Sequence, residues 1–284
     1  MKLSVIILAM TTSKELFRMT SNCINSLLES EQNIDMEILV IESNKEYFRS
    51  DFKYPDFVNV IIPDEDFNFH KFLNIGIKAS KGDFVALCNN DLIFYKNWFF
   101  EILKVQTENP SIKSFSPSGK IEDFAFSKPF EIGYKVRTHI MGWCIVAKRE
   151  VFPKIGYLDE TFDFNYADND YAMTLKCQNI KHAIVNASKV EHLDRKKRKE
   201  KKEDIGEGYK KLNEVVKFDN ITLPKYVFLE ENKWVLQDKK GLIDFVKFHE
   251  KWGSPKLLFR KNKLSDIFIK LKLGSLNWFL WLIK

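Results

Sequence analysis

Several features that would point to other protein classes are missing from this chain of 284 residues. Its four cysteines lie far apart, at Cys23, Cys88, Cys144 and Cys177. They form no CxxC pair, which argues against a thiolate zinc site and against a disulfide framework. No run approaches the ~18 consecutive apolar residues that a membrane-spanning helix needs, and the short apolar run at the start makes a weak signal peptide. We therefore expect a cytoplasmic protein with free thiols.

The composition is that of a globular protein with a sizeable core. Hydrophobic residues make up 45% of the chain and charged residues 30%, and the length allows one large domain or a domain with an appendage. The formal net charge of +6 favours anionic partners such as nucleotides, nucleic acids or lipid headgroups. Charge alone does not choose among them.

The first half of the chain alternates between strand-like and helix-like segments. Apolar runs of strand length recur at 3–9, 36–43, 59–65 and 83–89. Segments with apolar residues at helical spacing lie between them, at 16–28 and 70–80. A further helix rich in aromatic residues is expected to begin with Asn97 as its cap. Because the strands are apolar on both faces, the pattern predicts a parallel sheet covered by helices on each side.

Beyond the sheet region, the chain becomes strongly basic. The run RKKRKEKK at 195–202 is followed by a part without strand–helix alternation. We therefore expect an α/β domain over residues 1–215 and a mainly helical extension over 216–284. Residues 256–284 carry seven bases against one acid and predict a basic amphipathic helix. We expect this helix either to lie on an anionic membrane surface or to pack on the catalytic domain or on a second subunit of a homo-oligomer.

Polar side chains interrupt the apolar pattern where three of the predicted strands end. Thr11 follows the first strand, Glu42 and Asn44 end the second, and Asn89-Asn90-Asp91 follows the fourth. Ligands of parallel α/β sheets bind beyond the carboxyl ends of the strands. Glu42 suits hydrogen bonds from a nucleoside, and Asp91 suits a hard divalent cation that bridges phosphates. The ordinary alternatives are a helix cap for Glu42 and a turn residue for Asp91.

A second group of carboxylates, Asp168 and Asp170, stands at the start of a predicted helix. Capping explains one of the two, because carboxylates favour a helix N-terminus. A carboxylate held in a cleft can also take a proton from an acceptor hydroxyl. The aromatic residues before it, in FDFNYA, suit a wall that binds sugar. His192, near the end of the last predicted strand, is either a metal ligand or an ordinary surface histidine.

Taken in order, these elements resemble the inverting family 2 glycosyltransferases of GT-A fold. The resemblance runs through SVIIL, EILVIESN, FNFHKFLNIGIKASKGDFVALCNND, GWCIVAKREVFPKIGYLDETFDFNYADND and a late strand ending in histidine, over about residues 1–193. It implies a Rossmann-like, mostly parallel α/β sheet, a nucleotide-diphosphate-sugar donor, and a glycan or lipid-linked acceptor. It also implies a divalent metal, Mg²⁺ or Mn²⁺, and a role in surface polysaccharide or lipopolysaccharide biosynthesis, in the cytoplasm or at the inner face of the membrane.

The resemblance further implies roles for individual residues. The donor-binding positions are Thr11, Glu42, Asn44, Lys71, Asn74, Asn89 and Asn90. The acceptor-side positions are Gly142, Trp143 and Tyr166, and the metal positions are Asp91 and His192. Asp168 matches the catalytic base, but the family's preceding glutamate is Ala167 here, so Asp170 stays open as an alternative. The first acid of the family's DXD-type motif is Asn89, so the metal would rest on Asp91, the diphosphate and His192.

Three other functions compete with this interpretation. A nucleotidyltransferase would want a glycine-rich phosphate loop after the first strand, and AMTTSKE has no glycine. A glycosyltransferase acting on modified nucleic acid would also use the basic surplus. A non-catalytic nucleotide- or nucleic-acid-binding protein would use the basic run at 195–202, and salt-dependent DNA binding would reveal it.

Overall fold

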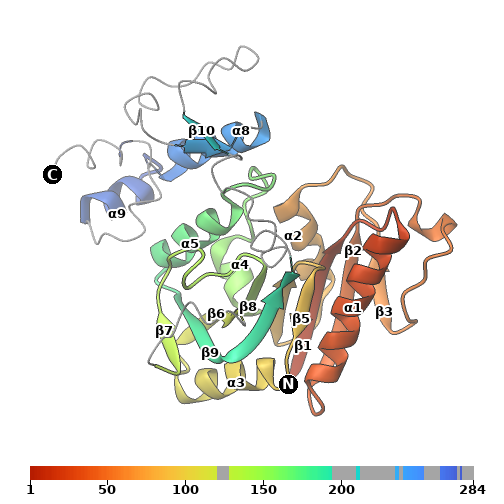
Figure 1. Ribbon diagram of the computed structural model, residues 1–284. Helices are drawn as coiled ribbons and strands as arrows, with labels where there is room; N and C mark the ends of the chain where they lie inside the picture. The colour runs from red at the N-terminus through yellow and green to blue at the C-terminus, as the bar shows by residue number, and fades with distance from the viewer. Residues whose placement is uncertain are drawn as a thin grey trace.

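The computed structural model describes residues 1–119, 128–193, 209–211, 234–236, 239–252, 263–273 and 276. The strand–helix alternation predicted for the first 193 residues forms one layered α/β unit (Figure 1). The basic run at 195–202 and the apolar run at 278–283 lie outside the described residues. No helix in the described part of the chain combines the length and the apolar character needed to cross a bilayer.

Nine strands of the described chain form one sheet, in the order β3-β2-β1-β4-β8-β6-β9-β5, with β7 pairing to β9. The strands are β1 (Lys2–Ala9), β2 (Asp35–Glu42), β3 (Val58–Ile61), β4 (Phe84–Cys88), β5 (Leu92–Phe94), β6 (Ile112–Ser118), β7 (Phe130–Ile132), β8 (Cys144–Lys148) and β9 (Lys181–His192). The first four strands are parallel, as the sequence predicts, whereas β8 runs antiparallel to β4 and β6. Apart from this sheet, β10 (Tyr209–Lys211) pairs with β11 (Trp234–Leu236).

Helices cover both faces of the sheet (Figure 1). One face carries α1 (Lys14–Ser30) and α3 (Trp98–Glu108), and the other carries α2 (Phe69–Ala79), α4 (Val151–Ile155) and α5 (Ala167–Cys177). A short 3₁₀ helix, η1 (Tyr47–Arg49), follows β2, and α8 (Lys239–Trp252) and α9 (Lys263–Lys270) come late in the chain. The two cores arise because strand side chains alternate: Val5 and Ile7 face one core, and Ile6 and Leu8 face the other.

The N-cap position of α3 falls at Asn97, as the sequence predicts, but the capping hydrogen bonds come from another residue. Asn97 occupies the N-cap position with φ 62°, but its side chain makes no capping hydrogen bond. Glu31, just past the end of α1, instead accepts hydrogen bonds from the backbone N–H of Phe99 at 2.6 Å and of Phe100 at 3.1 Å. A carboxylate also interacts favourably with the helix dipole there. The start of the helix was predicted, but not that the capping side chain comes from 68 positions away.

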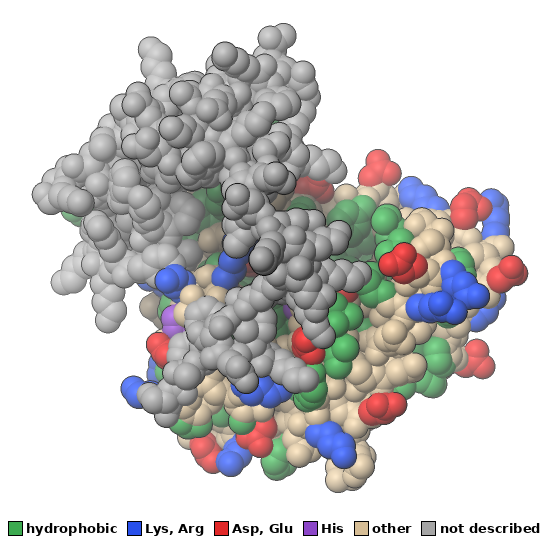
Figure 2. All heavy atoms as spheres, in the orientation of Figure 1, with side chains coloured by type: hydrophobic (Ala, Val, Ile, Leu, Met, Phe, Trp, Pro, Cys, Tyr) green, Lys and Arg blue, Asp and Glu red, His purple; other side chains and the backbone are tan. Residues whose placement is uncertain are grey.

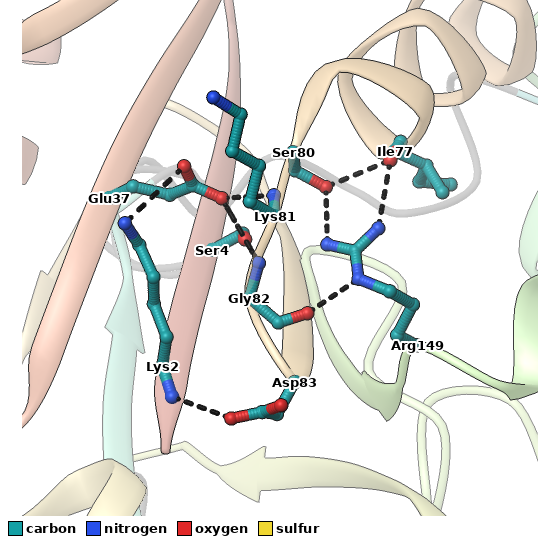
Figure 3. A network of polar contacts seen from close by, with 9 residues as sticks. All are labelled: Lys2, Ser4, Glu37, Ile77, Ser80, Lys81, Gly82, Asp83 and Arg149. Carbon is teal, nitrogen blue, oxygen red and sulfur yellow. Dashed lines mark hydrogen bonds and ion pairs between the residues drawn. The ribbon is translucent and has the colours of Figure 1, made fainter.

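Side chains close the amino-terminal end of the sheet. Glu37 accepts hydrogen bonds from the Ser4 hydroxyl at 2.5 Å and from the backbone N–H of Gly82 at 3.1 Å (Figure 3). Arg149 donates to the Gly82 carbonyl at 2.6 Å and to the Ser80 hydroxyl at 2.9 Å. These contacts join the first residues of β1 and β2 to the segment that leads into β4. Protein side chains therefore occupy this end of the sheet.

A buried polar group lies between β6, β9 and α5. His182 Nε2 lies 3.0 Å from the His139 carbonyl oxygen, so Nε2 carries a proton and donates it. His182 Nδ1 then accepts from the Ser114 hydroxyl at 2.8 Å, and Tyr171 donates to Ser114 at 2.9 Å. Burial lowers the pKa of His182 to about 3, although the bond to His139 opposes this. The serine–histidine pair is therefore a neutral element of the core.

His182 should make the protein less stable as pH falls. In the unfolded chain a histidine binds a proton near pH ~6.5, whereas folded His182 does not until about pH 3. The free energy of unfolding should therefore be highest above pH ~6.5 and decrease below it, by up to about 1.4 kcal/mol per pH unit from this group. Urea denaturation at about pH 7 and about pH 5 measures it. His182→Gln should show a smaller loss between the two; equal losses in both proteins would contradict the assignment.

Candidate functional site

Several of the predicted site residues lie at or just beyond the carboxyl ends of the parallel strands. The order β3-β2-β1-β4 places β2 on one side of β1 and β4 on the other. The strand order therefore reverses between β1 and β4, which is where open α/β sheets bind ligands. Thr11 lies just beyond β1, Glu42 ends β2, and Asn89 follows β4. With the opposite end of the sheet closed, this edge is the candidate site.

Glu42 presents one unused carboxylate oxygen at this edge. Its side chain is fully buried, at 0% exposure. Oε1 accepts hydrogen bonds from the backbone N–H of Thr11 at 2.9 Å and of Asn44 at 2.8 Å. Oε2 has no hydrogen-bond partner among the described residues. A buried acceptor left without a donor costs about 1–3 kcal/mol, so the position suits a ligand that brings a hydroxyl or an N–H.

Two tyrosines that sequence reasoning missed complete this side of the site. The Tyr54 hydroxyl lies 2.7 Å from the Thr11 hydroxyl, and the Tyr54 ring stacks on Tyr47 with centroids 5.4 Å apart. Burial raises the pKa of Tyr54 to about 12, against the hydrogen bond from Thr11. Its hydroxyl is therefore neutral and can donate. Both tyrosines stand outside the strands, where neither strand nor helix periodicity applies; the signal that could have found them is the aromatic density of YFRSDFKY.

Asp91 and His192 meet where β4 ends and β9 ends. Asp91 Oδ1 lies 3.1 Å from His192 Nε2, and the Asn89 side-chain amide lies 3.4 Å from the same nitrogen. The Trp143 ring stacks on the His192 ring, with centroids 5.8 Å apart and planes within 10°. Asn90 points elsewhere and donates to the Thr20 hydroxyl of α1 at 2.9 Å. The structure thus brings together the two residues predicted to hold a metal.

The donor set at this point fits a divalent cation that is shared with a ligand. Among the described residues, no group of three or more His, Cys, Asp and Glu side chains is arranged to hold a metal. Asp91 and His192 supply one oxygen and one nitrogen, and Asn89 lies beside them. Mg²⁺ typically binds one or two protein carboxylates and takes its other ligands from water and substrate phosphates. Two protein ligands therefore fit a cation that binds together with a diphosphate.

Asp168 lies in the first turn of α5, opposite Gly142. A side chain at Gly142 would place its Cβ 2.9 Å from Asp168 Oδ2, so glycine is what allows the carboxylate to sit there. Asp168 Oδ1 accepts a hydrogen bond from the Asn169 backbone N–H at 2.9 Å. Burial raises the pKa of Asp168, and the Arg137 charge, the Asn169 N–H and His70 oppose that rise. Gly142, His70 and Asp168 also line one small pocket. A carboxylate with a raised pKa suits a general base.

Asp170 has a different environment from Asp168. Its side chain is almost fully buried, and Oδ1 accepts hydrogen bonds from Trp252 Nε1 at 2.6 Å and from Lys251 Nζ at 2.7 Å. Burial raises the pKa of Asp170, while Lys251 and Trp252 oppose the rise. Both donors come from α8. Asp170 therefore faces the interior of the protein and a distant part of the chain.

A chain of contacts joins Asp91 and His192 to Asp168. The backbone N–H of Asn89 donates to the Trp143 carbonyl at 3.0 Å, and Trp143 stacks on His192. The residue before Trp143 is Gly142, whose Cα faces Asp168. The segment that leads into β8 thus connects Asp91 and Asp168, although the two are far apart in sequence.

The side chains of three other predicted site residues bind or pack against other residues of the chain. Lys71 pairs with Glu65, with Nζ and Oε1 3.2 Å apart. The Asn74 amide is buried, donates to the Leu158 carbonyl and to Glu160, and accepts from the Leu158 N–H. Tyr166 packs on two phenylalanines of α8.

The predicted aromatic wall is divided between the core and the surface. Phe162 is fully buried, whereas Phe164 is 61% exposed and meets Phe69 edge-on at 5.6 Å. A sugar can stack only on a ring that solvent reaches. Phe164 is therefore the most exposed aromatic ring of FDFNYA.

Comparison with known proteins identifies the family. The model described as "Glycosyl transferase family 2" matches residues 4–160, which is more than half of the chain. No curated protein matches the chain. Similar solved structures include S. aureus TarS 1-349 (TM-score 0.48, 15% identity, covering 66% of this chain and 58% of that one). GalNAc-T7 with UDP, GalNAc and Mn²⁺ is another (TM-score 0.49, 15% identity, 67% of this chain and 43% of that one). Each match covers less than two thirds of the solved chain.

Proposed function

The chain belongs to glycosyl transferase family 2, and on that basis we propose that it moves a sugar from a nucleotide-diphosphate sugar to a hydroxyl acceptor, with inversion. The observation that carries the proposal is the contact chain that joins Asp91 and His192, through Trp143 and Gly142, to Asp168. It supports a leaving-group site and a base at one edge of the sheet. Glu42, at the end of β2, supports a nucleoside site beside them.

Each part of the site has a role in this reaction. Glu42 Oε2 accepts a hydrogen bond from the nucleoside, and the neutral Tyr54 hydroxyl contributes a donor. Asp91 and His192 would hold a divalent cation, which would supply positive charge beside the leaving diphosphate. Asp168 removes the proton from the attacking hydroxyl. Attack from the face opposite the leaving group inverts the anomeric carbon.

The rival functions have less support in the described residues. Figure 2 shows Lys and Arg side chains interspersed with Asp and Glu on the visible face, without a basic patch among the described residues of that face. Nucleic-acid binding depends on gathered positive charge. The basic run at 195–202, on which that alternative rests, lies outside the described residues.

Donor binding tests the proposal directly. Nucleotide sugars with Mn²⁺ or Mg²⁺ should raise the melting temperature, because a ligand that binds only the folded state stabilises it. Glu42→Gln should weaken the affinity by about 10- to 100-fold, because an amide N–H₂ replaces the free oxygen and about 1–3 kcal/mol is lost. Isothermal titration measures this, with Glu46→Gln as a control on an exposed acid nearby. Absence of any stabilising nucleotide sugar, or equal affinity of Glu42→Gln and wild type, would contradict the proposal.

The late helix α9 supports a lipid-linked acceptor at an anionic membrane surface. The apolar side chains Leu264 and Ile267 of α9, and Leu271 just past its end, are 51%, 50% and 62% exposed. Lys270 and Lys272 are exposed beside them, and residues 256–284 carry six more bases than acids (seven minus one). Apolar and basic groups together suit the interface of a bilayer that contains anionic lipid.

Vesicle flotation tests this partner. The protein should float with vesicles that contain phosphatidylglycerol and less with vesicles of phosphatidylcholine alone, because basic residues gain ~1 kcal/mol each near an anionic surface. The triple variant Leu264→Ser, Ile267→Ser, Leu271→Ser should lose most of the bound fraction. The control is Phe57→Ser, which removes an exposed apolar residue elsewhere. Equal flotation of the triple variant and wild type would rule out α9 as the contact.

A further inference from the structure

Helix α8 contacts the segment that leads into Asp168, and we propose that it positions the catalytic carboxylate, with Asp170 as its anchor rather than as a base. The inference rests on the proposed function for its catalytic consequence, but its structural content stands separately. Residues 159–166 belong to the connection between α4 and α5, and α8 contacts this segment near both of the segment's ends. Polar contacts at each end of the segment, and ring contacts between them, join the segment to α8.

The first anchor is at the carboxyl end of α8. Lys251 Nζ lies 2.6 Å from Asp159 Oδ2 and 2.7 Å from Asp170 Oδ1. Trp252 Nε1 donates to the same Asp170 oxygen at 2.6 Å. One lysine thus joins the start of the segment to the first turn of α5. Removing one member would leave a buried charge without its partner, which is strongly destabilising.

The second anchor is two turns earlier in α8. Asp244 is buried, and its Oδ2 accepts hydrogen bonds from the backbone N–H groups of Asn165 at 3.0 Å and Phe164 at 3.3 Å. Asp244 and Lys251 are seven residues apart, so they lie on one face of the helix about 10 Å from each other. Helix α8 therefore holds residues 159–166 at two points, through Lys251 and through Asp244.

Between the anchors, α8 holds a residue with an uncommon backbone conformation. Tyr166 has φ 59°, a left-handed conformation that costs a bulky residue about 1–2 kcal/mol. Its ring lies 5.9 Å from the ring of Phe245 and 5.3 Å from that of Phe248. Such a conformation persists only where the surroundings impose it.

Tyr166 is only two residues from Asp168. A change in its backbone would therefore redirect the carboxylate, whose Oδ2 sits directly opposite Gly142. A displacement of about 1 Å in a catalytic group can cost ~10²-fold in rate. Helix α8 therefore positions the Asp168 carboxylate, although no side chain of α8 takes part in the reaction.

The alternative is that α8 only covers apolar surface. Phe248 and Trp252 belong to the second core, so some loss of stability follows from any change in α8 under both interpretations. The interpretations differ in what happens to the segment at a temperature where the variants are fully folded. A positioning role changes the dynamics of 162–166 and the catalytic rate; a covering role changes neither.

The test compares Asp244→Ala, which removes the acceptor, with Asp244→Asn, which keeps an amide oxygen in its place. Trp252→Phe removes only the N–H to Asp170 and keeps an aromatic ring. Glu250→Gln, on the exposed side of the same helix, is the matched control. Hydrogen–deuterium exchange reports the amides of 162–166, and steady-state kinetics separate kcat from the KM of the donor.

We expect exchange at 164 and 165 to accelerate at least tenfold in Asp244→Ala and to return towards wild type in Asp244→Asn. The kcat of Asp244→Ala and Trp252→Phe should fall at least tenfold, with the donor KM within about twofold of wild type. Lower melting temperature with unchanged exchange and unchanged kcat would overturn the proposal. If Asp244→Ala does not fold, Trp252→Phe decides by kcat. If the wild-type chain transfers no sugar, the proposed function fails, and the exchange data still decide whether α8 holds the segment.

Discussion

Asp168→Asn should remove most of the sugar transfer, about 10²- to 10⁴-fold in kcat, while leaving the affinity for the donor within about twofold of wild type. The amide has nearly the shape of the carboxylate and still fits opposite Gly142, but it cannot take the proton of the attacking hydroxyl. General base catalysis contributes about 10²- to 10⁴-fold, so kcat should fall by that order. Titration with the donor and single-turnover transfer measure the two quantities separately.

Asp170→Asn is the informative comparison for that variant. It should lower the melting temperature, because it weakens a buried pairing with Lys251 and Trp252. It should retain more transfer than Asp168→Asn, since Asp170 faces the interior. Full transfer by Asp168→Asn would place the base elsewhere, and Asp170 would then be the first residue to consider.

The pH dependence gives a second view of the same base. Burial raises the pKa of Asp168, so the rise of kcat/KM with pH should occur above the range of an ordinary aspartate. The Arg137 charge lowers that pKa, so Arg137→Gln should move the rise to still higher pH. An unchanged profile in Arg137→Gln would mean that another group controls it.

Asp91→Ala should remove the dependence of donor binding on metal. Asp91 would supply the carboxylate of the proposed cation site, and His192 alone is a weak site for Mg²⁺ or Mn²⁺. The wild-type affinity for a nucleotide sugar should fall by about 10- to 100-fold on adding chelator, whereas the affinity of Asp91→Ala should be low with or without metal. Calorimetric titration in Mn²⁺ and in EDTA measures this.

A suitable control lies at the other end of the sheet. Asp83 accepts a hydrogen bond from the backbone N–H of Lys2 at 2.8 Å. It lies at the amino-terminal end of the sheet, away from the carboxyl ends of the strands where Asp91 lies. Asp83→Asn should respond to chelator as wild type does. If Asp91→Ala also responds like wild type, Asp91 does not hold the metal.

Much of the fold follows from short-range patterns in the sequence. The apolar runs of β1, β2 and β4 predicted parallel strands, and the polar residues that end them predicted an edge with Glu42 and Asp91. The family match confirms the resemblance on which the role assignments depend. These features were predictable because strand periodicity and strand-end chemistry are local properties.

The remaining features depend on residues far apart in the chain, which periodicity does not connect. The position of Asn74 on α2 was predicted, but not that Leu158 and Glu160 engage its amide. Residues of α8 reach Asp170 from 82 positions away. The sequence predicts a helical extension over 216–284, but not that Phe248 and Trp252 of α8 pack into the core shared with α2 and α5. No local pattern indicates such a pairing.

The near-parallel stack of Trp143 on His192 gives the protein an optical signal of its own. Indole emission is quenched by a protonated imidazole in contact with it and by paramagnetic Mn²⁺ close by. The difference in fluorescence between wild type and Trp143→Phe should therefore isolate this one indole from the other five tryptophans. Binding of Mn²⁺ at the proposed cation site could then be followed in a stopped-flow instrument without a labelled donor or any knowledge of the acceptor.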